Sequence, residues 1–164
     1  MVKYLNTMIG FREIPDEISL LINITNCPIH CPDCHSKELW KDIGKDLSQR
    51  ALERLISENS GISCVCFMGG DASPKTIELL AEVINREYPN LKVAWYSGKE
   101  TFPEGLNLEY FDYIKIGPYI KQRGGLDNPN TNQKLYAKYS VVSEISGQNV
   151  SYWKDITKKF WKNG

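Results

Sequence analysis

Residues 62–84 read ISCVCFMGGDASPKTIELLAEVI, and this stretch decides the predicted fold because it indicates a complete strand–turn–helix unit. Its first seven residues are continuous and largely apolar, as in a strand that is buried on both faces. Gly69 and Gly70 permit a sharp turn, and Ser73 with Pro74 provides an N-cap and a first helical residue. The buried stripe of the helix is expected at Ile77, Leu80, Ala81 and Ile84. A buried strand followed by an amphipathic helix is the repeating unit of a parallel α/β sheet.

The same two patterns recur on both sides of this unit. Apolar runs and helical spacing predict further strands at 18–25, 91–97, 111–116 and 139–144 and helices at 47–59 and 150–162, the last with an aromatic face. The length leaves room for only about five βα units, fewer than a closed eight-fold barrel needs. The expected fold is therefore α/β, a partial and open β/α barrel of parallel strands that residues 1–164 form as a single domain.

The composition is that of an ordinary globular protein. Hydrophobic residues make up 41% of the 164 residues and charged residues 24%, which excludes a disordered chain. Lysine plus arginine and aspartate plus glutamate both number 20, and this zero formal charge argues against nucleic acid as a partner. No apolar stretch is long enough for a membrane span, and the first residues show no signal-peptide pattern. We therefore expect a cytoplasmic protein without membrane contact.

Three of the five cysteines stand close together directly after the first predicted strand. Cys27, Cys31 and Cys34 are spaced C-x3-C-x2-C, so their thiols can converge from one loop. Three cysteines can hold a 4Fe–4S cluster and leave one iron open to a substrate. The alternative is a structural zinc site in which His30 or His35 is the fourth ligand.

Cys64 and Cys66 form a second pair, within the strand of residues 62–68. Residues two apart in a strand share one face, so this pair has the geometry of two metal ligands. Free cysteines in a buried strand are more often small core residues, and that interpretation is favoured here.

The cysteine loop together with Gly69-Gly70-Asp71 resembles the radical S-adenosylmethionine (SAM) superfamily. Within it, the chain is similar to the activating enzymes of anaerobic (class III) ribonucleotide reductases over roughly residues 3–145. The segments that carry this similarity are 26–36, 67–71, 95–98, 112–120 and 131–133. The resemblance implies a radical SAM type of fold and one 4Fe–4S cluster, held by Cys27, Cys31 and Cys34.

The resemblance also implies a reaction and a binding site for SAM. An electron from the cluster cleaves SAM into methionine and a 5′-deoxyadenosyl radical, which takes a hydrogen atom from a glycine of a partner enzyme. Gly69, Gly70 and Asp71 are then expected to receive the methionyl amino group of SAM. The residues expected to lie near its adenine are Asp33, Cys34 and His35, and those near its ribose or methionyl part are Tyr96 and Ser97. Two positions depart from the superfamily pattern: Asp33 replaces an aromatic residue, and Ala72 replaces the proline after the acidic residue.

Two partners follow from the same resemblance: the glycyl radical loop of an anaerobic ribonucleotide reductase, and an electron donor such as flavodoxin or ferredoxin. Residues 117–135 lack periodicity and are rich in glycine and asparagine, which favours a functional loop over a mere connector. Its part from Gly117 to Gln133 is the first candidate for contact with the reductase. The alternatives are a small-molecule radical SAM enzyme, such as a 7-carboxy-7-deazaguanine synthase, and a non-enzymatic interaction module stabilised by zinc.

Overall fold

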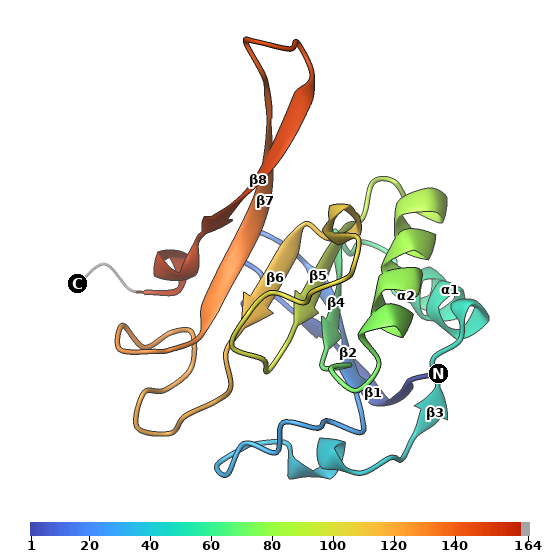
Figure 1. Cartoon of the computed structure of the whole chain (residues 1–164). Coiled ribbons are helices and arrows are strands. Elements are labelled where there is room, and N and C mark those ends of the chain that lie inside the picture. The colour runs from blue at the N-terminus through green and yellow to red at the C-terminus, as the bar shows by residue number, and fades with distance from the viewer. Residues whose placement is uncertain (162–164) are drawn as a thin grey trace.

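Eight β-strands form one sheet, in the order β3-β1-β2-β4-β5-β6-β7-β8 (Figure 1). The structure is a computed structural model and describes residues 1–161. The strands are β1 (Lys3–Gly10), β2 (Ser19–Ile24), β3 (Lys45–Asp46), β4 (Cys64–Met68), β5 (Lys92–Tyr96), β6 (Tyr113–Ile116), β7 (Lys134–Val142) and β8 (Asn149–Asp155). The α-helices are α1 (Gln49–Glu58) and α2 (Pro74–Glu87), and the short 3-10 helices are η1 (Lys37–Trp40), η2 (Leu108–Tyr110) and η3 (Thr157–Phe160).

The centre of the sheet is parallel and its flanks are antiparallel. Strands β2, β4, β5 and β6 run parallel as successive neighbours. On one flank β1 pairs antiparallel with β2 and β3, and on the other β7 pairs antiparallel with β6 and β8. Parallel strands have their carboxyl ends at the same edge of a sheet, so the segments that follow the four central strands meet at one edge.

This mixed sheet shows that the predicted barrel of about five βα units with parallel strands is wrong. Only two connections between parallel strands contain an α-helix: α1 lies between β2 and β4, and α2 between β4 and β5. The connection from β5 to β6 holds only the three-residue η2, because Gly98, Pro103 and Gly105 interrupt any longer helix. After β6 the chain turns back through residues 117–133 and pairs antiparallel, which ends the series of βα units.

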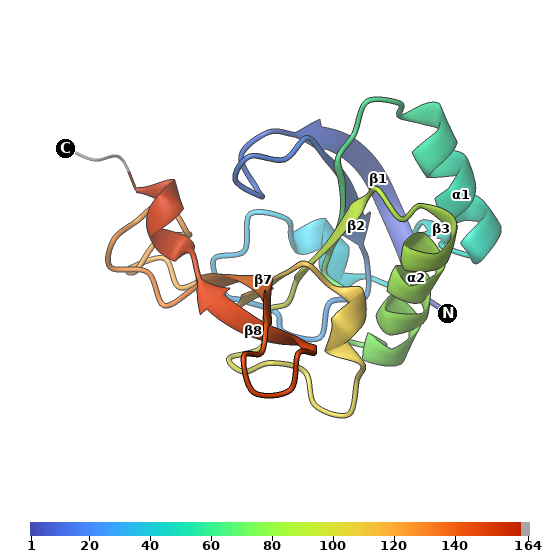
Figure 2. The same cartoon turned by 90° about the horizontal axis from the view of Figure 1, so that it is seen from above.

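Both α-helices lie on the same side of the sheet (Figure 2). Their apolar stripes and the alternate strand residues that face them form one core cluster, which includes Leu52, Leu55, Val65, Phe67, Ile77, Leu80 and Trp95. The remaining strand residues point to the opposite face, where a second cluster includes Leu21, Cys64, Cys66, Ala94, Leu135 and Ile156. We call this second face the helix-free face. Within residues 1–161, no helix combines the length and the apolar character that a bilayer crossing requires.

The central strands and both α-helices were predicted with small errors at their ends. Strands β2, β4, β5 and β6 lie inside the predicted runs, and the predicted strand at 139–144 overlaps only the end of β7. The first turn of α1 is capped by Ser48, whose hydroxyl accepts the N–H of Ala51 at 3.1 Å. Ser73 occupies the N-cap of α2 as expected but makes no capping hydrogen bond with its side chain. Strand β1 was not predicted.

The predicted helix at 150–162 is wrong over the residues that the structure describes, and residue 162 lies outside them. Residues 149–155 form β8 and continue into η3. Gly147 has a positive φ of 68° and reverses the chain, so that β8 pairs with β7 as a long hairpin that projects from the molecule (Figure 1). Val150, Tyr152 and Trp153 are β-branched or aromatic and favour this extended conformation.

Leu52→Ala in α1 is expected to lower the free energy of unfolding by about 2–5 kcal/mol, because Leu52 is completely buried in the core under the helices. Leu79→Ala in α2 is the matched control, since the side chain of Leu79 is 52% exposed. This control should change the free energy by no more than about 0.5 kcal/mol. Urea denaturation followed by circular dichroism measures both variants, and equal losses would contradict the packing described above.

Candidate functional site

The cysteine loop leaves β2 at the carboxyl edge of the sheet. Asn26 and His30 have positive φ values of 61° and 51°, and each directly precedes a cysteine. This left-handed conformation is uncommon for residues other than glycine, and it turns the backbone sharply ahead of Cys27 and again ahead of Cys31. The amide of Cys27 also donates to the carbonyl of Leu39 at 3.0 Å. The loop is thereby folded back on the segment that contains η1.

All three loop cysteines are free thiols and partly buried. Backbone N–H groups face two of them. The amide of Ser36 donates to Sγ of Cys34 at 3.4 Å. Burial raises the pKa of the Cys27 thiol, and the amides of Ile29 and His30 act in the opposite direction by donating to its sulfur. Such N–H groups stabilise the thiolate, which is the form that binds iron.

The three thiols do not converge on the position of a single metal ion. Within residues 1–161, no three His, Cys, Asp or Glu side chains are placed to share one ion. His30 instead stacks on Trp40 with ring centroids 4.7 Å apart, and His35 packs edge-on against Tyr119 at 4.9 Å. In a 4Fe–4S cluster each cysteine binds a different iron, so its thiols surround a larger body and do not meet at one point. The structure therefore gives no support to a zinc site of three cysteines and one histidine.

A buried carboxylate joins the ends of β4 and β5 at this edge. Asp71 is 6% exposed, and its two oxygens accept the hydroxyl of Ser97 at 2.6 Å and the amide of Gly98 at 2.8 Å. Ile29 of the cysteine loop packs closely on Gly98: a Cβ placed on Gly98 would lie only 2.8 Å from Cγ1 of Ile29. These contacts bring the cysteine loop against the segments that follow β4 and β5, where the predicted residues Asp71 and Ser97 lie.

The two predicted glycines form the turn after β4. Gly69 and Gly70 have φ values of 107° and 102°, a conformation that favours glycine. The carbonyl of Gly69 accepts the indole N–H of Trp95 at 2.8 Å, and the carbonyl of Gly70 accepts the amide of Ser73 at 3.0 Å. Gly70 lines a small cavity of about 220 Å³ beside Asn26. The turn is therefore fixed by hydrogen bonds that engage both glycine carbonyls.

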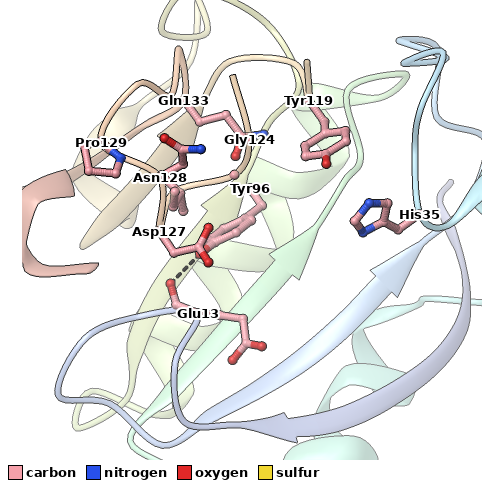
Figure 3. Close-up of a pocket in the computed structure, with 11 residues that line it drawn as sticks. Glu13, His35, Tyr96, Tyr119, Gly124, Asp127, Asn128, Pro129 and Gln133 are labelled. Atoms are coloured by element: carbon pink, nitrogen blue, oxygen red, sulfur yellow. Dashed lines mark hydrogen bonds between the residues drawn. The ribbon is translucent and has the colours of Figure 1, made fainter. Parts of the chain in front are cut away.

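A larger cavity of about 910 Å³ opens on the helix-free face (Figure 3). Of the predicted site residues, His35 and Tyr96 line it, whereas the three cysteines, Asp33, the glycine turn and Ser97 do not. The hydroxyl of Tyr96 donates to the carbonyl of Glu13, which joins this wall to the turn between β1 and β2. The remaining walls come mainly from the loop after β6, at Tyr119, Gly124, Gly125, Leu126, Asp127, Asn128, Pro129 and Gln133.

Sequence reasoning missed two polar residues of this region, Glu13 and Lys115, whereas Gln133 ends the loop that was predicted to contact a partner. Lys115 is 8% exposed, and its ammonium group donates to the carbonyls of Ser97 at 3.2 Å and Gly117 at 2.7 Å. A lysine inside an otherwise apolar strand was the available signal, since lysine is rarely buried without a specific partner. Glu13 stands in a loop and carries no comparable signal in the sequence.

Cys64 and Cys66 are core residues, as the favoured interpretation expected. Both are fully buried in the cluster on the helix-free face. Burial raises the pKa of both thiols, which keeps them protonated. The sulfur of Cys66 lies 3.5 Å from the sulfur of Met68.

Three free thiols in one hydrogen-bonded loop at the end of a buried strand are typical of an iron–sulfur protein. The sequence matches the model of the 4Fe-4S single cluster domain family over residues 17–120, and the chain belongs to that family. The matched region runs from the residues before β2 through the cysteine loop and the glycine turn to the residues after β6. No curated protein and no solved structure matches the chain.

Gly98→Ala is expected to displace the cysteine loop, because the new methyl group would overlap the side chain of Ile29. Overpacking of this kind costs about 1–3 kcal/mol, so iron and sulfide bound per chain after anaerobic reconstitution should fall several-fold. Gly125→Ala is the matched control, since a Cβ there meets its nearest atom, an oxygen of Asp127, at 3.6 Å. Equal iron content in both variants would show that the Ile29–Gly98 contact does not position the thiols.

Proposed function

We propose that this iron–sulfur protein cleaves SAM reductively and activates an anaerobic ribonucleotide reductase. One electron from a donor such as flavodoxin or ferredoxin cleaves one SAM into methionine and a 5′-deoxyadenosyl radical. That radical takes a hydrogen atom from a glycine of the reductase, which yields 5′-deoxyadenosine and a glycyl radical. The reaction requires a reducing compartment, and we propose that the protein acts in the cytoplasm.

The observation that carries this proposal is the contact between the cysteine loop and the segments after β4 and β5. Ile29 lies between the first two cysteines of the loop and packs on Gly98, whose amide donates to Asp71. The cysteine loop and the Gly69-Gly70-Asp71 turn are separate in the sequence, and together they carry the resemblance to SAM-cleaving enzymes. In the structure they lie against each other at one edge of the sheet. This juxtaposition supports a reaction that needs a cluster and a bound ligand side by side.

Cys27, Cys31 and Cys34 would hold the cluster. With three protein ligands, a bound 4Fe–4S cluster supplies both an electron and an iron that is free to bind the amino and carboxylate groups of SAM. The half-buried position of the three thiols and the N–H groups that face their sulfurs suit this role. The ammonium group of Lys115 adds a buried positive charge at the same edge, where a carboxylate is favoured.

The cavity on the helix-free face supports a nucleoside-sized ligand. Its volume of about 910 Å³ is at the upper end of the usual range for small-molecule sites. His35 and Tyr119 provide aromatic surface on one side, and Tyr96 provides it on another (Figure 3). Gln133, which is 8% exposed, places an amide at the same cavity. Aromatic rings with a small number of polar groups are suited to bind adenine and ribose.

The loop after β6 supports a protein substrate. It supplies most of the cavity wall, including the exposed carboxylate of Asp127. No α-helix covers this side of the sheet within the described residues, so a loop of a large partner has access to the cavity (Figure 2). We therefore propose that the residues from Gly117 to Gln133 contact the glycyl radical loop of the reductase.

Reconstituted protein, given dithionite and SAM without oxygen, is expected to release 5′-deoxyadenosine. Cys31→Ala should lower the yield at least a hundredfold, because it removes one of the three proposed cluster ligands. Cys64→Ala is the matched control: it also removes a thiol, but one that lies in the core. Chromatographic quantification of 5′-deoxyadenosine measures the effect, and absence of product from wild-type protein with a full cluster would refute SAM cleavage.

Asp127→Lys is expected to lower the yield of glycyl radical on the reductase about tenfold, since it reverses a charge at the mouth of the cavity. Because Asp127 also lines the cavity, the radical yield is expressed relative to the rate of SAM cleavage measured without the reductase. Asp46→Lys reverses an exposed charge on β3 and serves as the control. Electron paramagnetic resonance of the mixed proteins quantifies the radical. If Asp127→Lys activates the reductase as well as the wild type does, the loop does not contact the partner at this residue.

A further inference from the structure

Lys115 is the only buried lysine or arginine among residues 1–161. It lies on β6 and alternates with Ile114 and Ile116, which face the helices, so its side chain points to the helix-free face. The ammonium group also lies 5.8 Å from the centre of the Tyr96 ring. A buried cation costs desolvation free energy, and this cost calls for a compensating negative charge or ligand.

The protein itself satisfies two of the three ammonium hydrogens. They go to the carbonyls of Ser97 and Gly117, which follow β5 and β6. Asp71 accepts a hydrogen bond from Ser97 and from Gly98, and Ile29 of the cysteine loop packs on Gly98. Lys115 is therefore fixed in position relative to the cysteine loop through a short series of contacts.

The charges near Lys115 show what its cation can act on. Burial lowers the pKa of Lys115 to about 8, and the negative charges of Asp71, Cys31 and Cys27 act in the opposite direction. These influences agree with the contacts that connect Lys115 through Ser97, Asp71 and Gly98 to the cysteine loop. In a buried site such an interaction is screened far less than at the surface.

Reduction of an iron–sulfur cluster adds one negative charge to it. Net charge and solvent exposure around a cluster set its reduction potential, and a fixed positive charge favours the reduced state. We infer that Lys115 raises the reduction potential of the cluster held by Cys27, Cys31 and Cys34 and so makes its reduction by the electron donor easier. The inference rests on the cluster site of the proposed function, but it does not depend on cleavage of SAM.

Two variants separate the charge of Lys115 from its hydrogen bonds. Lys115→Met keeps an unbranched side chain that is one atom shorter and removes both the charge and the donors. Lys115→Gln removes the charge but keeps an amide N–H₂ that can donate to the carbonyls of Ser97 and Gly117. Lys99→Met is the matched control, because the side chain of Lys99 is an exposed cation near the same edge and water screens its charge.

A redox titration of the reconstituted proteins, followed by electron paramagnetic resonance without SAM, measures the reduction potential. In both Lys115 variants the ratio of reduced to oxidised cluster at a fixed potential should fall about tenfold, which is about 59 mV for one electron. Iron and sulfide per chain should match the wild type, and Lys99→Met should titrate as the wild type does.

Three results would overturn the inference. The first is a Lys115→Gln variant that holds a full cluster and titrates at the wild-type potential. The second is a Lys99→Met variant that shifts as far as the Lys115 variants, since any nearby lysine would then suffice. The third is loss of the cluster from both Lys115 variants, which would make Lys115 an assembly residue. A protein that shows the expected shift but releases no 5′-deoxyadenosine would refute the proposed function and leave the role of Lys115 intact.

Discussion

The hydrogen bonds of Asp71 join the segment after β4 to the segment after β5, beyond the last paired residues of the two strands. A buried carboxylate without partners is costly, and here both oxygens are satisfied by groups that follow β5. One of those groups is the amide of Gly98, and the absence of a side chain on Gly98 makes room for Ile29. The position of the thiols therefore depends on a residue that is more than thirty positions away from them in the sequence.

The two faces of the sheet differ in what covers them, and this difference places the site. The helix side is filled by large residues such as Phe67 and Trp95. On the helix-free face the central strands carry the smaller Cys64, Cys66 and Ala94. The cavity lies on this same face, where Tyr96 and the loop after β6 form its walls. The larger cavity thus lies on the side of the sheet that the α-helices do not cover.

The sequence predicted the parts of the fold in which one local signal is strong. Continuous apolar runs identified the four central strands, and the C-x3-C-x2-C spacing identified the loop that agrees with the 4Fe-4S family. The order and direction of the outer strands were missed because they depend on pairing between distant residues. Strand β1 has no clear apolar alternation, since only Tyr4 and Gly10 of its eight residues are buried. In β8 the spacing of Val150, Trp153 and Ile156 imitates a helix. This segment forms a strand because it pairs with β7.

The candidate site was predictable in its ligands and less so in its surroundings. The cysteines and Asp71 stand in recognisable motifs, whereas Ile29 and Gly98 are ordinary residues whose importance lies in one contact. Lys115 gave a signal that was not used, since a charged residue in a buried strand demands an explanation. Glu13 reaches the cavity only because the turn between β1 and β2 lies next to Tyr96. A local sequence pattern cannot predict this proximity.

The two ends of the sheet offer different opportunities to an added strand. At one end β3 pairs with only Lys3 and Tyr4 of β1, so the outer edge of β1 beyond Tyr4 has no partner strand within the described residues. At the other end β8 is seven residues long, and its outer backbone edge has no partner strand within the described residues. Lys154 and Asp155 are charged residues of the kind that discourage uncontrolled pairing at such an edge. Both ends of the sheet therefore leave backbone open to strand addition, but only the edge of β8 lies on a hairpin that projects from the rest of the molecule (Figure 1).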